Sequence, residues 1–218
     1  MPHSCLLYYI TDRSQFPGDE RARSRALLAK VAEAARAGVD YIQLREKDLS
    51  ARELETLARE VVAAVRKNSP STRLLINSRT DVALAAGADG VHLRADDVSP
   101  HEVRQVVEFS AHRPTAAGHF IVATSSHTVA DVFRTESEKA DFAVFAPVFG
   151  KRGAAGTSSA GLAALREACR AKIAVLALGG VTIENVASCL EAGAAGVAGI
   201  RLFQENKIED VVRALRAH

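Results

Sequence analysis

Short apolar runs recur along the chain and alternate with longer stretches of helical periodicity. Four of these runs have the length and the aliphatic or β-branched composition of buried strands. They span residues 5–10, 73–77, 119–124 and 173–179. Because strands that are apolar throughout are typical of sheets covered on both faces, the pattern favours a parallel sheet.

Residues 51–67 give the clearest amphipathic helix, since apolar side chains recur there every three or four positions. Ser50 stands just before this stretch, and Glu53 follows it three positions later. This spacing predicts a capping box, in which the two side chains satisfy free backbone N–H groups. Residues 100–108 and 160–170 show a similar helical pattern.

An internal repeat supplies four more strands. In each copy a helical stretch ends, a short turn rich in Ala and Gly follows, and an apolar strand begins, as expected where a helix folds back on a strand. The copies are AARAGVDYIQLR (34–45), ALAAGADGVHLR (83–94), SEKADFAVFAP (137–147) and CLEAGAAGVAGI (189–200). Their spacing of about 50 residues leaves room for two strands and two helices per repeat.

Eight strands alternating with helices predict a compact (β/α)8 TIM barrel, which we expect to be a single domain over residues 1–218. The alternative is a doubly wound open sheet. No GxGxxG motif follows the first strand, so the dinucleotide-binding form of that fold is not indicated.

The composition is that of an ordinary globular protein, with 48% hydrophobic and 25% charged residues and a formal net charge of +2. We expect no nucleic acid as a partner, because the aromatic residues are not interleaved with basic runs. No apolar run reaches the length of about 18 residues needed to cross a membrane. The N-terminus lacks a signal-peptide pattern, and the three cysteines have no metal-like spacing, so we expect a cytoplasmic protein with buried thiols.

The segment YIQLREKD (41–48) takes a buried strand directly into four charged residues. Alternation along the strand places Gln43, Arg45 and Lys47 on one side, and in a barrel the carboxyl ends of the strands build the active site. These three side chains predict a site for an anion such as phosphate or diphosphate. The alternative is a solvated turn in which Glu46 and Asp48 neutralise the two cations.

Other predicted strands also end in polar groups. Gly179-Gly180 ends the seventh strand, and Ile200 and Arg201 end the eighth. Backbone N–H groups at these two positions bind phosphate in many barrels. A plain tight turn is the alternative for the glycine pair.

His92 alternates inward and is expected to line the barrel interior. His127 lies at a strand end, where capping or a satisfied hydrogen bond is more common than the alternative, a catalytic role. Asp97, next to Asp96, is the best candidate ligand for Mg²⁺, which takes few protein ligands. An Asp before Val-Ser-Pro is also a good residue to start a helix.

The chain resembles thiamine phosphate synthase and its close relative, the thiazole tautomerase. The resemblance rests on YIQLREKD, LLINSRTDVALAAGADGVHLRADDVSP, SSHT, FAPVFGK and LALGGVTIENV, and it covers nearly the whole chain. It implies a transferase that couples hydroxymethylpyrimidine diphosphate with thiazole phosphate and releases diphosphate. The implied mechanism is dissociative, with a pyrimidine methyl cation captured by the thiazole nitrogen.

The resemblance also implies residue roles. Gln43, Arg45, Lys47 and Asn77 would surround the diphosphate, Asp97 would bind Mg²⁺, and Ser125 would contact the pyrimidine. Backbone groups at Gly179, Gly180, Ile200 and Arg201 would bind the thiazole phosphate. The partners would be phosphorylated small molecules, and a homo-oligomer stays open as an alternative to a monomer.

Several positions depart from the synthase pattern. Ser78 replaces a magnesium-binding Asp, Arg94-Ala95 replaces Gly-Gln, and Arg201 stands where Ser is usual. The loop FGKRGAAGTSSAG lacks the Thr-x-Thr-Lys pattern and is shorter, so Lys151 or Arg152 would supply its cation from a different position.

Two alternatives follow from these departures. One is a thiazole tautomerase-like isomerase, although Pro147 stands where that enzyme has a His and the Gln-Leu-Arg-Glu-Lys string is a synthase feature. The other is a non-catalytic barrel that binds a thiamine precursor.

Overall fold

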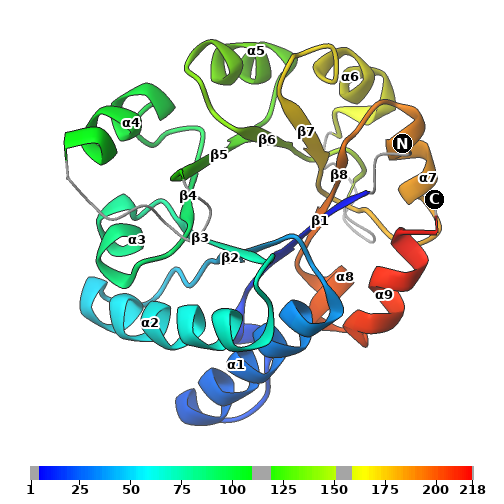
Figure 1. Ribbon diagram of the computed structural model, residues 1–218. Coiled ribbons are helices and arrows are strands. Elements are labelled where there is room, and N and C mark those ends of the chain that lie inside the picture. The colour runs from blue at the N-terminus through cyan, green and yellow to red at the C-terminus, as the bar shows by residue number, and fades with distance from the viewer. Residues whose placement is uncertain (1–4, 110–118, 151–158, 218) are drawn as a thin grey trace.

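A computed structural model describes residues 5–109, 119–150 and 159–217. Eight parallel strands close into a barrel in sequence order, with β1 hydrogen-bonded to both β2 and β8. Helices surround this barrel on the outside (Figure 1). The predicted (β/α)8 fold is therefore confirmed, and the doubly wound alternative is wrong.

The elements follow one another as strand and helix along the chain. They are β1 Leu6–Ile10, the 3-10 helix η1 Arg13–Gln15, α1 Glu20–Ala37, β2 Tyr41–Leu44, α2 Ala51–Asn68, β3 Arg73–Asn77, α3 Thr80–Ala86, β4 Gly90–Leu93, α4 Pro100–Phe109, β5 Ile121–Ser126, α5 Val129–Ser137, β6 Phe142–Phe145, α6 Gly161–Ala168, β7 Ala174–Ala177, α7 Val186–Glu191, β8 Gly196–Gly199, α8 Arg201–Gln204 and α9 Ile208–Leu215.

The hydrophobic core has two layers because successive strand residues face opposite sides. Tyr8, Leu75, Phe142 and Val144 belong to the inner layer, which fills the barrel. The larger outer layer joins the strands to the helices. Tight filling of the interior leaves the carboxyl ends of the strands as the place for a site.

The predicted capping box is present at the start of α2. The Ser50 side chain accepts a hydrogen bond from the backbone N–H of Glu53, and the Glu53 carboxylate accepts one from the backbone N–H of Ser50. The helix predicted over residues 160–170 is shorter, at Gly161–Ala168.

The repeat has a structural cause at the amino ends of the strands. Gly38, Gly87 and Gly193 follow the helices with positive φ, and Lys139 takes the same conformation in the third copy. In three copies an Asp then accepts a hydrogen bond from a backbone N–H of the preceding strand. These pairs are Asp40 with Leu7, Asp89 with Leu74 and Asp141 with Val122.

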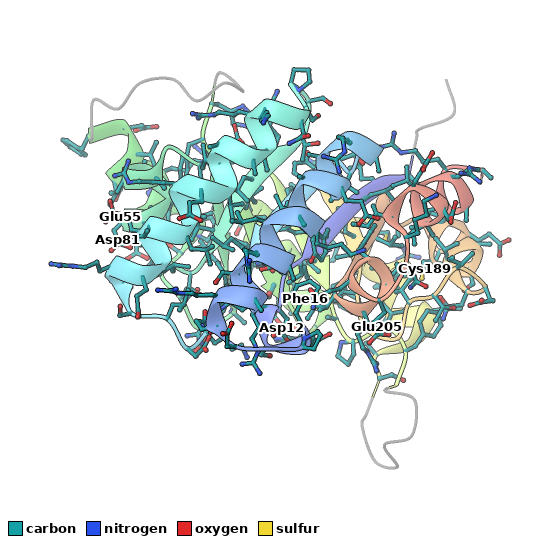
Figure 2. All side chains as sticks on the ribbon, turned by 90° about the horizontal axis from the view of Figure 1, so that it is seen from below. Asp12, Phe16, Glu55, Asp81, Cys189 and Glu205 are labelled. Carbon is teal, nitrogen blue, oxygen red and sulfur yellow. The ribbon has the colours of Figure 1, made fainter. Side chains whose placement is uncertain are left out.

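The loops that follow the strands gather at one end of the barrel, which we call the mouth. Figure 2 shows Asp12 and Phe16, which follow β1, and Glu205, which follows β8, at the same end of the molecule. In the part of the chain that the structure describes, no helix is long and apolar enough to cross a membrane.

Candidate active site at the barrel mouth

Gln43 is the last inward-facing residue of β2 and is buried. Tyr41, two positions earlier, packs against the core inside the barrel, so alternation turns Gln43 inward as well. Its amide Nε2 donates to Asn77 Oδ1 over 3.4 Å. The structure thus brings together two of the predicted site residues from neighbouring strands.

Arg45 and Lys47 follow β2 at the mouth, where Arg45 is half-buried and Lys47 is exposed. The backbone N–H of Arg45 donates to Thr11 Oγ1 at 3.0 Å, which ties the two loops after β1 and β2. The positive charge of Arg45 also lowers the pKa of His92, so its side chain acts on the barrel interior.

The two acids of YIQLREKD do not neutralise Arg45 and Lys47; that interpretation is wrong. Glu46 is buried and accepts hydrogen bonds from the hydroxyl of Thr11 and from the backbone and guanidinium of Arg13. Asp48 pairs with the same guanidinium. Both acids therefore turn toward the loop after β1, because the buried guanidinium of Arg13 lies there.

Arg13 was not singled out from the sequence, although its guanidinium is the centre of this charge cluster. Its side chain is 3% exposed and pairs with Glu20, Glu46 and Asp48. Burial alone would lower the pKa of Arg13, but hydrogen bonds to the three carboxylates outweigh it and raise the pKa. Burial also raises the pKa of Glu46, against the opposing hydrogen bonds from Thr11 and Arg13.

Asn77 ends β3, and Ser78 follows it in a tight turn. Ser78 has a φ of 61°, which is uncommon for a residue other than Gly, and Arg79 N–H donates to Asn77 O across it at 2.7 Å. The Ser78 hydroxyl accepts from Asn77 Nδ2 at 3.1 Å. Strained backbone of this kind often lies at functional sites.

His92 lies inside the barrel, as predicted. Its Nδ1 lies 3.1 Å from the Tyr8 hydroxyl, and its Nε2 lies 2.9 Å from the Ser125 hydroxyl. Burial lowers the pKa of His92 to about 3, and Arg45 acts in the same direction while Asp97 opposes it. His92 is therefore neutral near pH 7 and holds the half-buried Ser125 in place.

Asp97 lies in the loop after β4, with its side chain 14% exposed. Its carboxylate accepts from the backbone N–H of Arg94 at 2.7 Å and pairs with the Arg94 guanidinium. The helix-start interpretation of Asp97 is wrong, because Ser99 and Glu102 form the reciprocal hydrogen bonds that begin α4. Asp97 and Ser125 both line a cavity of about 230 Å³.

Gly179 and Gly180 follow β7 with φ values of 95° and 65°. A Cβ on Gly179 would lie 2.7 Å from Pro147, and one on Gly180 would lie 2.7 Å from Phe149 Cβ. Only glycine fits both the conformation and the close approach of the loop after β6. The glycine pair is thus more constrained than a plain tight turn requires.

Ile200 is half-buried against the interior core, and the exposed Arg201 is the first residue of α8. Because β7 and β8 are neighbours, this segment lies beside the glycine pair at the mouth. His127 makes a hydrogen bond as expected, with Nδ1 2.8 Å from the carbonyl oxygen of Ala146, which follows β6. Lys151 and Arg152 lie outside the described residues.

The fold and this polar rim define a (β/α)8 barrel with its site at the carboxyl ends of the strands. The family model described as thiamine monophosphate synthase matches residues 7–203. The chain belongs to the thiamine monophosphate synthase family.

Individual relatives agree with this assignment. The chain is 38% identical to a thiamine-phosphate synthase of Methanoculleus marisnigri, over 96% of this chain and 93% of the relative. It is 34% identical to that of Chlorobium luteolum, over 99% and 93%. Among solved structures, thiamine phosphate pyrophosphorylase from Pyrococcus furiosus superposes with a TM-score of 0.78 at 26% identity, covering 99% of this chain and 95% of the other.

Proposed function

We propose that this protein is a thiamine-phosphate synthase, a transferase that joins hydroxymethylpyrimidine diphosphate to thiazole phosphate. The observation that carries the proposal is the end of β2, where Gln43 meets Asn77 and Arg45 follows at the mouth of a barrel of this family. Cations and amides at one strand end suit a diphosphate better than an uncharged substrate.

The reaction does not depend on a nucleophile from the protein. The bond between the pyrimidine methylene carbon and the diphosphate oxygen breaks, diphosphate leaves with the electron pair, and the thiazole nitrogen lone pair forms the new bond to carbon. Arg45 and Lys47 stabilise the charge that gathers on the departing diphosphate, and Lys151 adds a further cation. Such preorganised charge is a large part of catalysis in reactions of this kind.

Two other parts of the mouth hold the rest of the substrates. Ser125, which His92 orients from inside the barrel, contacts the pyrimidine. Backbone groups at Gly179, Gly180, Ile200 and Arg201 bind the phosphate of the thiazole. The glycine pair has positive φ and Arg201 begins α8, which supports this role.

The donor set near the diphosphate suits a Mg²⁺ ion that arrives with the substrate. Among the described residues, no three His, Cys, Asp or Glu side chains gather closely enough to hold a metal alone. Asp97 offers one carboxylate and Ser78 a hydroxyl. Mg²⁺ is commonly bound by one or two carboxylates together with substrate phosphates and water, so this set fits. When bound, the ion supplies positive charge to the leaving diphosphate.

The alternatives are less well supported. The family description and the relatives name the synthase, and nothing in the described part of the mouth favours a tautomerase or a binding protein without activity. Phosphorylated small molecules are the substrates; a cytoplasmic location and a homo-oligomer stay predictions.

Incubation with both substrates and Mg²⁺, followed by chromatographic measurement of thiamine phosphate, tests the proposal. We expect product with the wild type and a higher Mg²⁺ requirement with Asp97→Ala. Asp96→Ala is the matched control, because Asp96 is exposed and bonds only to Arg94 among the described residues. Retained binding of thiazole phosphate without any product would contradict the synthase and favour the binding barrel.

A further inference from the structure

A charged clamp joins the loop after β1 to the segment that carries Arg45 and Lys47. Arg13 uses Nη1 and Nη2 on the two oxygens of Asp48, at 2.6 and 3.0 Å, and Nη1 also reaches Glu46 at 3.1 Å. Its Nε donates to Glu20 of α1 at 2.7 Å. Removing a guanidinium from water is unfavourable, so a buried Arg with this many partners needs a reason.

The reason for burying Arg13 lies in the segment REKD (45–48), where its partners alternate along the chain with two cations. Glu46 and Asp48, which Arg13 holds, alternate with Arg45 and Lys47. The strand β2 ends at Leu44, and a turn begins at Lys47. Between them, Glu46 is bonded to Arg13 in the loop after β1, whereas the charge of Arg45 acts on His92 inside the barrel, so the two side chains lie on opposite sides of the chain. Lys47 stands between two residues that are both anchored.

The backbone is held on the same side. Thr11 Oγ1 accepts from the backbone N–H of Arg45 at 3.0 Å and donates to Glu46 Oε1 at 2.6 Å. The backbone N–H of Arg13 donates to Glu46 Oε2 at 3.0 Å. The chain is therefore pinned just before and just after the side chain of Arg45.

We infer that Arg13 is a positioning residue for the diphosphate site, acting through Arg45 and Lys47 without touching the substrate. The inference rests on the proposed function, because it assigns a diphosphate to these two cations. Both have long flexible side chains, and catalysis by charge needs them held before the substrate arrives. Lys in place of Arg13 would lack the planar fork that spans Asp48 and Glu46.

The test uses the full chain with Arg13→Ala and Arg13→Lys. Calorimetric titration with inorganic diphosphate and Mg²⁺ should show affinity reduced about tenfold to a hundredfold in Arg13→Ala, with Arg13→Lys in between. The specificity constant for pyrimidine diphosphate should fall by a similar factor, while the KM for thiazole phosphate stays within about twofold. A general loss of structure would change both substrates together.

Arg104→Ala is the matched control. Arg104 also bonds to three groups, at Lys139, Phe120 and Asp141, but these precede β5 and β6 at the end of the barrel away from the mouth. We expect it to lower thermal stability without changing diphosphate binding. Equal diphosphate affinity in Arg13→Ala and wild type would overturn the inference.

A second variant covers the case in which Arg13→Ala does not fold. Asp48→Asn weakens the clamp at its exposed side, where the Asp48 side chain is 67% exposed. It should weaken diphosphate binding in the same direction by a smaller factor, and unchanged binding would count against the inference.

A double-mutant cycle separates positioning from direct binding. If Arg13 acts through Arg45, adding Arg13→Ala to Arg45→Ala should change diphosphate affinity much less than it does in the wild type. Fully additive effects of the two substitutions would overturn a role through Arg45. The binding readout also works without turnover, so a wild type that binds diphosphate and makes no thiamine phosphate would refute the proposed function alone.

Discussion

Ser78 is the residue at which this chain differs most consequentially from the synthase pattern. The resemblance to the synthase implies an acidic metal ligand at this position, and Ser78 stands there with a left-handed backbone and a hydrogen bond from its N–H to His92 O. Asp and Asn are the residues that tolerate this conformation best after Gly. The turn is therefore already shaped for the carboxylate that the sequence lacks.

Ser78→Asp should lower the Mg²⁺ concentration needed for half-maximal synthesis of thiamine phosphate. A second carboxylate adds charge to a proposed donor set in which Asp97 now supplies the carboxylate and Ser78 a hydroxyl, and the backbone needs no rearrangement. Ser78→Asn is the control, since it has the same shape without the charge. An equal effect of both substitutions would show that Ser78 does not face the metal.

His92 makes the folding stability depend on pH. The native chain keeps the imidazole neutral because burial lowers its pKa to about 3, whereas the unfolded chain takes up a proton below its ordinary pKa of about 6.5. This contribution is complete above pH 6.5 and is lost as the pH falls toward 3, by up to about 1.4 kcal/mol per pH unit.

Urea unfolding at pH 7 and pH 5 measures this effect. Wild type should lose about 2 kcal/mol more between the two values than His92→Gln, which has no proton to gain. His101→Gln removes an exposed imidazole and serves as the control. The same loss in wild type and His92→Gln would mean that His92 is protonated in the native chain.

At the scale of elements, each part of the mouth depends on contacts with the next loop. The end of β2 is held by the loop after β1, and the turn after β7 packs under the loop after β6. The parallel strands fix where each loop begins, and side chains from neighbouring loops fix its shape. A substitution in one loop should therefore also affect substrate binding by the residues of the neighbouring loop.

Gly180→Ala tests the packing of the turn after β7. The added Cβ meets a left-handed backbone and lies 2.7 Å from Phe149, so the free energy of unfolding should fall by about 2–4 kcal/mol. Gly161→Ala is the matched control, because Gly161 has a φ of 78° but, among the described residues, no atom within 4 Å of an added Cβ.

Chemical denaturation and titration with thiazole phosphate give the two readouts for this pair. Gly161→Ala should lower the free energy of unfolding only by the cost of the left-handed backbone, about 1–2 kcal/mol. Its affinity for thiazole phosphate should stay unchanged. If both variants lost the same stability and both bound thiazole phosphate normally, the turn would have no special role.

At the scale of the whole molecule, the barrel could be predicted because its signals are local and repeated. Eight apolar strands and a turn pattern in four copies leave few other arrangements. The copies hide real differences, however: Lys139 replaces Gly in one, and Ala195 stands where the others have a strand-capping Asp. These exceptions are tolerated because neighbouring strands already fix the register.

The site could be predicted only in part. The side of β2 that faces the mouth followed from alternation, and Gln43 and Asn77 do meet. The hydrogen-bond partners of Glu46 could not be predicted, because Arg13 lies 33 residues away and no sequence pattern near either residue indicates the pair. Long-range ion pairs of this kind leave no spacing in the sequence, whereas strand alternation does.

The most direct test of the central claim is the specificity constant for pyrimidine diphosphate in wild type and Arg45→Ala. A synthase that holds its leaving group at the end of β2 should form thiamine phosphate and lose about a hundredfold or more on this substitution, as when one preorganised donor is removed. The KM for thiazole phosphate should change little. Equal rates in the two proteins, or no product from the wild type, would contradict the account.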